Sequence, residues 1–194
     1  MKRFLFLSIG LLFTFFVACD KNDESTPNVS ETGEWQIFID GESVDLPIGH
    51  SIYYNQGFGA LDYGELQIYF SNATGDQLLL DIRNYEPQNY PENEVIPKIY
   101  DTDELGANTE CNEGPDGNNY CDIAYAGYST SDSLIYDTYF HESTSPGKIE
   151  ITECDAESLK VSGTFEFEVE EYIGVGDNLI IKGSFSNVPY KVLY

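Results

Sequence analysis

Basic residues are scarce in this chain, whose 194 residues include 9 Lys plus Arg against 34 Asp plus Glu, for a formal net charge of −25. Binding to a phosphate backbone depends on Lys and Arg, so this balance excludes electrostatic binding of nucleic acid. It also excludes a polybasic attachment to anionic lipid. Apolar residues nevertheless make up 41% of the chain and aromatic residues 14%. That is enough for one packed core, and we expect a folded domain rather than a disordered chain.

The motifs of common enzyme mechanisms are also missing. The two histidines, His50 and His141, do not stand in a zinc-ligand spacing such as H-E-x-x-H. There is no G-x-S-x-G, no phosphate-cradling glycine loop and no C-x-x-C. The sequence therefore assigns no catalytic residue, and we predict that the protein is not an enzyme. A carboxylate-based glycan hydrolase is the alternative, since 34 acids supply some pair at a suitable separation whatever the function.

A long apolar run occurs near the start of the chain, over residues 4–18, after the basic residues Lys2 and Arg3. At about 1.5 Å per residue such a run spans roughly 22 Å, less than the roughly 30 Å of a bilayer core. This pattern predicts a signal peptide over residues 1–18. The run ends in Phe16-Val17-Ala18-Cys19, which resembles a bacterial lipobox and implies acylation of Cys19, including palmitate. The alternative is an ordinary secretory signal in which Cys19 has no role.

The segment after the signal peptide, residues 19–33, is polar and has no hydrophobic period. It therefore predicts a flexible acidic tether behind the lipidated cysteine. Its acidic cluster resembles the export signal of surface-displayed lipoproteins in Bacteroidota-type bacteria. We expect the protein to be held in the bacterial outer membrane by acyl chains on Cys19. The cell surface is slightly favoured over the periplasmic face.

From residue 34 to 194 the dominant pattern alternates apolar and polar residues. The alternation is clear over residues 35–39, 66–70, 78–82, 123–128, 134–140, 148–153, 161–169 and 179–185. Asp40-Gly41 is typical of a hairpin turn. No stretch shows a sustained helical stripe with caps. The pattern predicts a single all-β domain, an antiparallel sandwich or lipocalin-like barrel with little helix, whose wet faces carry acids such as Glu166 and Glu168.

Residues 85–120 interrupt the alternation with four prolines and many Asn, Asp and Gly. A long irregular loop in a compact domain usually has a function or is locally disordered. Cys111 and Cys121 bracket its turn-rich part, and export permits a disulfide, so we predict that they pair. Cys154 is then left as a thiol, for which a buried inert role is favoured over a nucleophilic one.

Two kinds of ligand site fit this loop. Tyrosines present a flat apolar ring with a polar tip, which suits sugar rings and peptides, although strand tyrosines more often only pack. The candidate ligand-binding residues are Tyr85, Tyr90, Tyr100 and Tyr120. Hard oxygen ligands also favour Ca²⁺, the one metal considered, although no segment matches an EF-hand loop. The candidate calcium ligands are Asp101, Asp103, Asp116 and Asp122. No other cofactor is expected.

Three segments near the end of the chain carry a family resemblance. They read G-K-I-E-I-T from Gly147, S-G-T-F-E-F from Ser162 and G-S-F-S-N-V-P from Gly183. The pattern resembles an uncharacterised family of small Bacteroidota-type lipoproteins with a lipocalin-like domain of unknown function. The resemblance implies structural roles: glycines at strand crossings, phenylalanines in the core, and Asn187-Val188-Pro189 closing an edge. It implies no activity and no binding residue.

Together these observations favour a lipid-anchored, non-enzymatic module at the cell envelope. Its expected partners are the lipid bilayer, through Cys19, and a carbohydrate, peptide or envelope protein held on the side of residues 85–120. A purely structural envelope subunit is a further alternative, in which the acidic surface serves solubility.

Overall fold

A computed structural model describes residues 33–58, 61–84, 95–102, 109–113, 117, 119–138, 147–171 and 177–193. These residues form strands connected by turns and irregular segments, and none of them is helical. The strands are β1 (Glu34–Ile39), β2 (Glu42–Val44), β3 (Ile48–Phe58), β4 (Leu61–Ser71), β5 (Gln77–Asn84), β6 (Ile99–Asp101), β7 (Cys111–Glu113), β8 (Asn119–Cys121), β9 (Ile123–Ser129), β10 (Ile135–Asp137), β11 (Gly147–Asp155), β12 (Lys160–Glu171) and β13 (Leu179–Leu193). The predicted all-β fold is confirmed. No helix in this part of the chain is long and apolar enough to cross a membrane.

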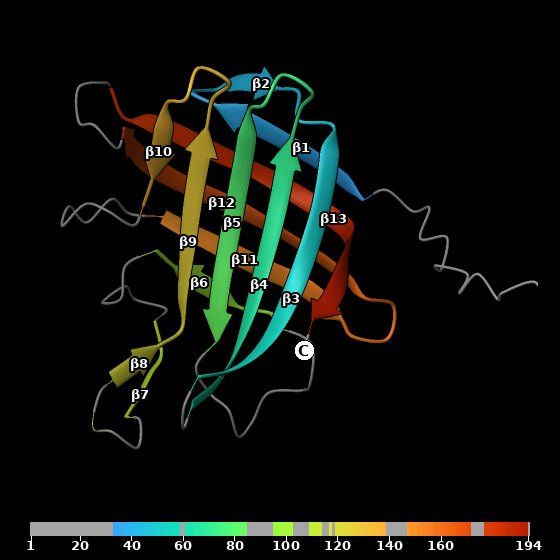
Figure 1. Cartoon of the computed structure of the whole chain (residues 1–194), viewed down its shortest axis with the longest axis vertical. Helices are drawn as coiled ribbons and strands as arrows, with labels where there is room; N and C mark the ends of the chain where they lie inside the picture. Colours follow the sequence, from blue (N-terminus) through green and yellow to red (C-terminus); the bar gives the residue numbers. More distant parts are fainter. Residues whose placement is uncertain are drawn as a thin grey trace, which may run out of the picture.

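One large sheet folds over on itself into two packed layers. Its strand order is β2-β1-β13-β3-β4-β5-β9-β10-β12-β11-β6, and an additional pairing joins β13 to β12. Figure 1 shows β3, β4, β5, β9 and β10 as the front layer, with β1, β13, β12, β11 and β6 crossing behind them. Because β13 pairs with both β12 and β3, the strands from β3 to β12 form a closed circuit around the core.

The core lies between the two layers and follows the predicted alternation. Buried apolar side chains come from the inward positions of each strand: Leu66, Ile68 and Phe70 of β4, Leu78, Leu80 and Ile82 of β5, and Val161, Phe165, Phe167 and Val169 of β12. On β12 the intervening Glu166 is exposed, as a sheet with one wet face requires. Gly183 of β13 lies against the Gln36 carbonyl and the ring of Phe165, where a Cβ atom would collide with both.

The predicted turn at Asp40-Gly41 joins β1 to β2. Both residues have positive φ angles, 50° and 85°. A two-residue hairpin turn of this kind matches the twist of the strands on either side, and glycine adopts the second position without steric cost. The Asp40 carboxylate also accepts a bond of 2.9 Å from the Ile180 amide, which ties the turn to the start of β13.

One strand pairing departs from the antiparallel pattern. Residues 190–193 of β13 pair in parallel with residues 51–54 of β3, whereas earlier residues of β13 pair antiparallel with β1 and β12. The expectation that Asn187-Val188-Pro189 closes an edge is therefore wrong. Val188 and Pro189 lie opposite Val161 and Lys160, and β13 continues through them into the front layer. The segment is the point at which one strand passes from the back layer to the front layer.

Residues 85–120 are more ordered than predicted wherever the structure describes them. Strand β6 pairs with β11, placing Tyr100 opposite Ile149, and Val95 is fully buried. Strands β7 and β8 form a separate small hairpin. The prediction of one long irregular loop is wrong for these residues, because a buried side chain and edge pairing hold the segment against the back layer. Its remaining residues, 85–94, 103–108, 114–116 and 118, lie outside the described part.

Candidate ligand-binding groove

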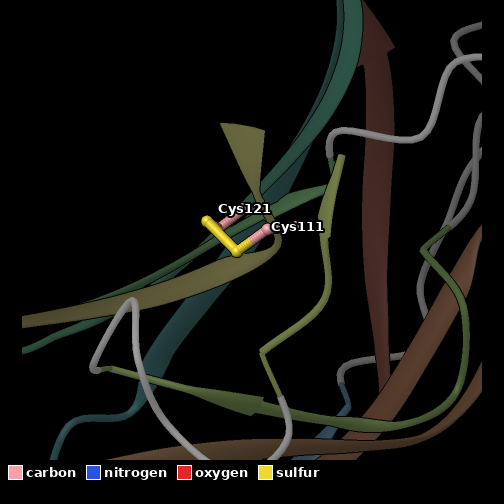
Figure 2. Close-up of a disulfide and its surroundings, with 2 residues drawn as sticks. All are labelled: Cys111 and Cys121. Carbon is pink, nitrogen blue, oxygen red and sulfur yellow. A yellow bond between two sulfur atoms is a disulfide. The ribbon is translucent and has the colours of Figure 1, made fainter. Parts of the chain in front are cut away.

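The predicted disulfide between Cys111 and Cys121 is confirmed. The two cysteines lie opposite each other in the β7–β8 hairpin, and Figure 2 shows the sulfur atoms joined. Cys154 is a reduced cysteine. Its side chain packs against the core, and its sulfur lies 3.8 Å from the hydroxyl of Tyr190. This setting is that of a half-buried structural residue.

Of the four tyrosines proposed for the 85–120 segment, the structure describes the surroundings of Tyr100. Tyr100 is only 1% exposed, and its hydroxyl donates a bond of 2.8 Å to the Ile96 carbonyl. It is a core residue of this segment. Tyr120 belongs to β8, and Tyr85 and Tyr90 lie outside the described residues. The described residues of this segment therefore do not support a tyrosine-lined ligand site.

Two of the candidate calcium ligands, Asp101 and Asp122, lie in the described part, and Asp122 forms an ion pair with Lys98. Asp122 is 1% exposed and accepts a bond of 2.6 Å from Lys98, whose ammonium also bonds to Glu110 at 2.8 Å. Burial alone would lower the pKa of Lys98, but these bonds outweigh it and the pKa is raised. Asp101 lies in β6, while Asp103 and Asp116 fall outside the description. Across the described ranges, no three metal-binding side chains come together.

A groove does occur on the outer face of the front layer. It has a volume of about 380 Å³ and runs across β5, β9 and β10. Its lining residues are Gln77, Leu79, Asp81, Arg83, Tyr125, Ala126, Gly127, Tyr128, Ser129, Ile135 and Asp137. The outward positions of β5 supply the first four of them, because alternate residues of a strand point to opposite faces. Gly127 has no side chain, which leaves room above the sheet at the middle strand.

Two acids of this outer face are almost completely buried, Asp81 in the groove lining and Glu65 outside the lining on the neighbouring strand β4. Glu65 of β4 is 5% exposed and Asp81 of β5 is 6% exposed, although both lie on the outer face. Arg83 donates a bond of 2.9 Å to Asp81 Oδ2 and lies 3.6 Å from Glu65 Oε1. Asp81 Oδ1 is buried and has no hydrogen-bond donor among the described residues. One guanidinium thus serves two carboxyl groups.

This arrangement raises the pKa of Asp81 to about 7. Burial is the largest cause, and the charge of Glu65 adds to it, while Arg83 acts in the opposite direction. Near neutral pH the Asp81 carboxyl group is therefore protonated about half of the time.

A chain of polar contacts extends from the acid pair across the sheet. Gln67 donates a bond of 2.6 Å to Glu65, and the Tyr69 hydroxyl donates one of 2.5 Å to Gln67. The imidazole of His50 stacks on the Tyr69 ring with centroids 4.9 Å apart. On the other side, the Arg83 guanidinium lies 4.9 Å from the ring centroid of Tyr125. The outer face therefore has an ordered polar network rather than independent solvated side chains.

Sequence reasoning missed Glu65, Asp81 and Arg83. A signal was present, because Asp is depleted in strands and Asp81 stands within the apolar run from Leu78 to Ile82. Arg83 follows two positions later and must share a face with Asp81. The pairing of β4 with β5, which brings Glu65 opposite Arg83, was not readable from the sequence.

A family model described as a domain of unknown function, DUF6252, matches residues 60–189 of the chain. The matched region contains all of the groove-lining residues. No curated protein and no solved structure matches the chain.

Proposed function

The chain belongs to this family of domains of unknown function (DUF6252), and from that premise we propose that it is a non-enzymatic, lipid-anchored envelope protein that binds a ligand in the outer groove of β5, β9 and β10. The observation that carries the proposal is the almost completely buried Asp81 in the lining of a largely apolar groove, where Arg83 is its partner and is shared with a second buried acid, Glu65. The expected ligand classes are a carbohydrate, a peptide or a segment of another envelope protein.

Burying a charged group on the outer face of a sheet costs free energy. A carboxylate removed from water is unfavourable unless it is paired and hydrogen-bonded, and solvent is the ordinary partner on the wet face of a sheet. Glu65 and Asp81 instead share Arg83, and one carboxyl oxygen has no donor. Concave sites with mostly apolar linings and a few fixed polar groups are the usual form of small-ligand sites. This groove has that form.

The setting of the acids supports binding over glycan hydrolysis. Glycosidases place two carboxyl groups on either side of the scissile bond, about 5 Å or more apart. Asp81 lines the groove but Glu65 does not, and Arg83 lies against both carboxyl groups, at 2.9 Å and 3.6 Å. Asp81 and Glu65 therefore do not flank a ligand held in the groove.

The envelope location rests on the N-terminal sequence. The lipobox-like Phe16-Val17-Ala18-Cys19 and the acidic segment after it support acylation of Cys19 and outer-membrane anchoring, with surface display favoured. Protease treatment of intact cells tests this part. We expect release of the domain and an acylated Cys19 peptide retained in the membrane. An unmodified Cys19 would refute the anchor, and full protection of the domain until the outer membrane is opened would place it on the periplasmic face.

The groove is tested by comparing two substitutions at one position. A Cβ atom at Gly127 would lie 3.8 Å from its nearest neighbours, at Asp137 and Tyr136, so alanine is accommodated. Gly127→Phe adds a ring that fills the groove, while Gly127→Ala is the matched control. In a thermal-shift panel of oligosaccharides, peptides and small metabolites, a ligand should raise the Tm of the wild type and of Gly127→Ala but not of Gly127→Phe. Equal shifts in all three proteins, or no shift with any compound, would refute the groove as the site.

A further inference from the structure

The further inference rests on the proposed function of the groove. We propose that the ligand presents a primary ammonium group on an aliphatic stem, with the ammonium at Asp81, whose negative charge Glu65 reinforces, and with the stem along Leu79 and Ile135. This chemistry is offered by a free alkylamine and by a lysine side chain. The inference deepens the proposed function by naming what the acid pair recognises.

The buried cluster combines two acidic side chains with one guanidinium group. Glu65 and Asp81 carry two negative charges when both are ionised, and Arg83 carries one positive charge. A buried cluster of this kind lacks one positive charge, and either a proton or a ligand cation restores neutrality. An ammonium also brings three N–H donors, and Asp81 Oδ1 is buried without one.

The rest of the groove suits an aliphatic stem. Leu79 and Ile135 lie on its walls, and Ile135 is 47% exposed, so a methylene chain placed there would be shielded from water. Asp137 on β10 adds a second acid to the lining. An anionic ligand would be repelled by these acids and by the formal net charge of −25. The long-range field of such a chain attracts cations.

Charged and titratable groups face Asp81 from each neighbouring strand. Glu65 and Tyr69 belong to β4, Arg83 to β5 itself, and Tyr125 of β9 lies directly opposite Asp81. Burial, followed by the charges of Tyr54, Asp81 and Glu65, raises the pKa of Tyr69, so it stays neutral near pH 7. Asp81 is therefore the group near the ammonium whose proton is exchanged in this range. Because the pKa of Asp81 is about 7, a cation must displace that proton below pH 7.

The first test uses the unmodified chain and n-pentylammonium chloride as the probe. The probe remains charged at both pH 6 and pH 8, and 1-pentanol is its uncharged counterpart. Competition with a proton of pKa about 7 predicts binding about tenfold tighter at pH 8 than at pH 6, measured by calorimetry. Pentanol should bind more weakly at pH 8 and show no such dependence. Equal affinity at the two pH values would overturn the inference.

Two isosteric substitutions locate the effect. Asp81→Asn removes the charge in the groove, and Asp132→Asn removes one from an exposed turn, so the two variants have the same net charge. We expect the pH 8 affinity for pentylammonium to fall at least tenfold in Asp81→Asn and to be unchanged in Asp132→Asn. Equal losses would show a general field effect and overturn the site. If Asp81→Asn does not fold, the pH comparison on the wild type still decides.

Further binding measurements distinguish a free amine from a lysine side chain as the source of the ammonium. They also distinguish failure of the ammonium inference from failure of the proposed function. Binding of 1,5-diaminopentane with no binding of an Nα-acetyl-lysine amide would support a free amine, and the reverse would support a lysine side chain. Binding of a neutral oligosaccharide in the groove, without binding of pentylammonium, would overturn the ammonium inference. It would leave the proposed function intact. Absence of binding by every compound, with Gly127→Phe indistinguishable from wild type, would overturn both.

Discussion

Asp81 makes the stability of the fold depend on pH in a predictable direction. Its pKa is about 7 in the folded protein against 3.8 as the ordinary value. A group whose pKa is raised on folding stabilises the folded state most fully below its unfolded pKa, and this contribution is lost as the pH rises through the folded pKa. Between pH 5 and pH 8 the unfolded chain has already released this proton, whereas the folded chain releases it near pH 7.

The magnitude follows from the interval over which the proton is held. From pH 5 to about pH 7 the folded state binds close to one proton more than the unfolded state does. At 1.36 kcal/mol per pH unit, the free energy of unfolding should fall by roughly 2–3 kcal/mol over these two units on account of Asp81 alone. Asp81→Asn removes the titration and keeps the shape, so the variant should lack this part of the fall.

The assay is urea unfolding at pH 5 and pH 8, followed by tyrosine fluorescence or circular dichroism. Any constant cost of the substitution cancels, because the measured quantity is the difference between the two pH values within each protein. Asp132→Asn controls for the loss of one negative charge and should retain the full fall. A fall of the same size in wild type and Asp81→Asn would refute the reasoning about the buried acid pair.

Three further predictions concern the Lys98–Asp122 ion pair, the buried amide of Asn84 and the disulfide. Lys98→Met leaves the carboxylate of Asp122 buried without its ammonium partner. It should lower the free energy of unfolding, measured in urea, by about 3–5 kcal/mol. A loss of unfolding free energy no larger than that of the control Lys148→Met would contradict the role of the ion pair. Asn84→Leu replaces a buried amide that has no hydrogen-bond partner within the described residues, so the free energy of unfolding should rise by about 1–3 kcal/mol, and a lower Tm would oppose this account. Replacing both cysteines of the β7–β8 disulfide by serine should cost about 2–3 kcal/mol, and an unchanged unfolding midpoint would contradict it.

Local alternation was sufficient to predict most strands. In β4, β5 and β12 the apolar residues at every second position are the buried ones, because a strand with one buried face must alternate. The Asp40-Gly41 turn was predictable for the same kind of reason, since its backbone conformation favours these residue types. These features depend on neighbours in sequence.

Features set by distant strands were not predictable. The parallel pairing of β13 with β3 joins residues 190–193 to residues 51–54, and nothing within either segment specifies that partner. The short strand β6 has no visible period because its position is set by pairing with β11 and by the burial of Tyr100. The acid pair likewise needs β4 beside β5 before Glu65 and Asp81 can share Arg83. The sequence showed where acids were abundant but not which two were buried together.

The central claim, that a ligand occupies the outer groove, is tested most directly by mapping binding on the isotope-labelled domain with nuclear magnetic resonance. Pentylammonium, or any compound that raises the Tm in the panel, would be titrated while backbone amide shifts are followed. The account predicts that the largest shifts fall on Leu79, Tyr125, Gly127 and Ile135, which line the groove, and disappear in Gly127→Phe. Shifts concentrated on the β7–β8 hairpin or on the outer face of β11, β12 and β13, with the groove unaffected, would contradict it.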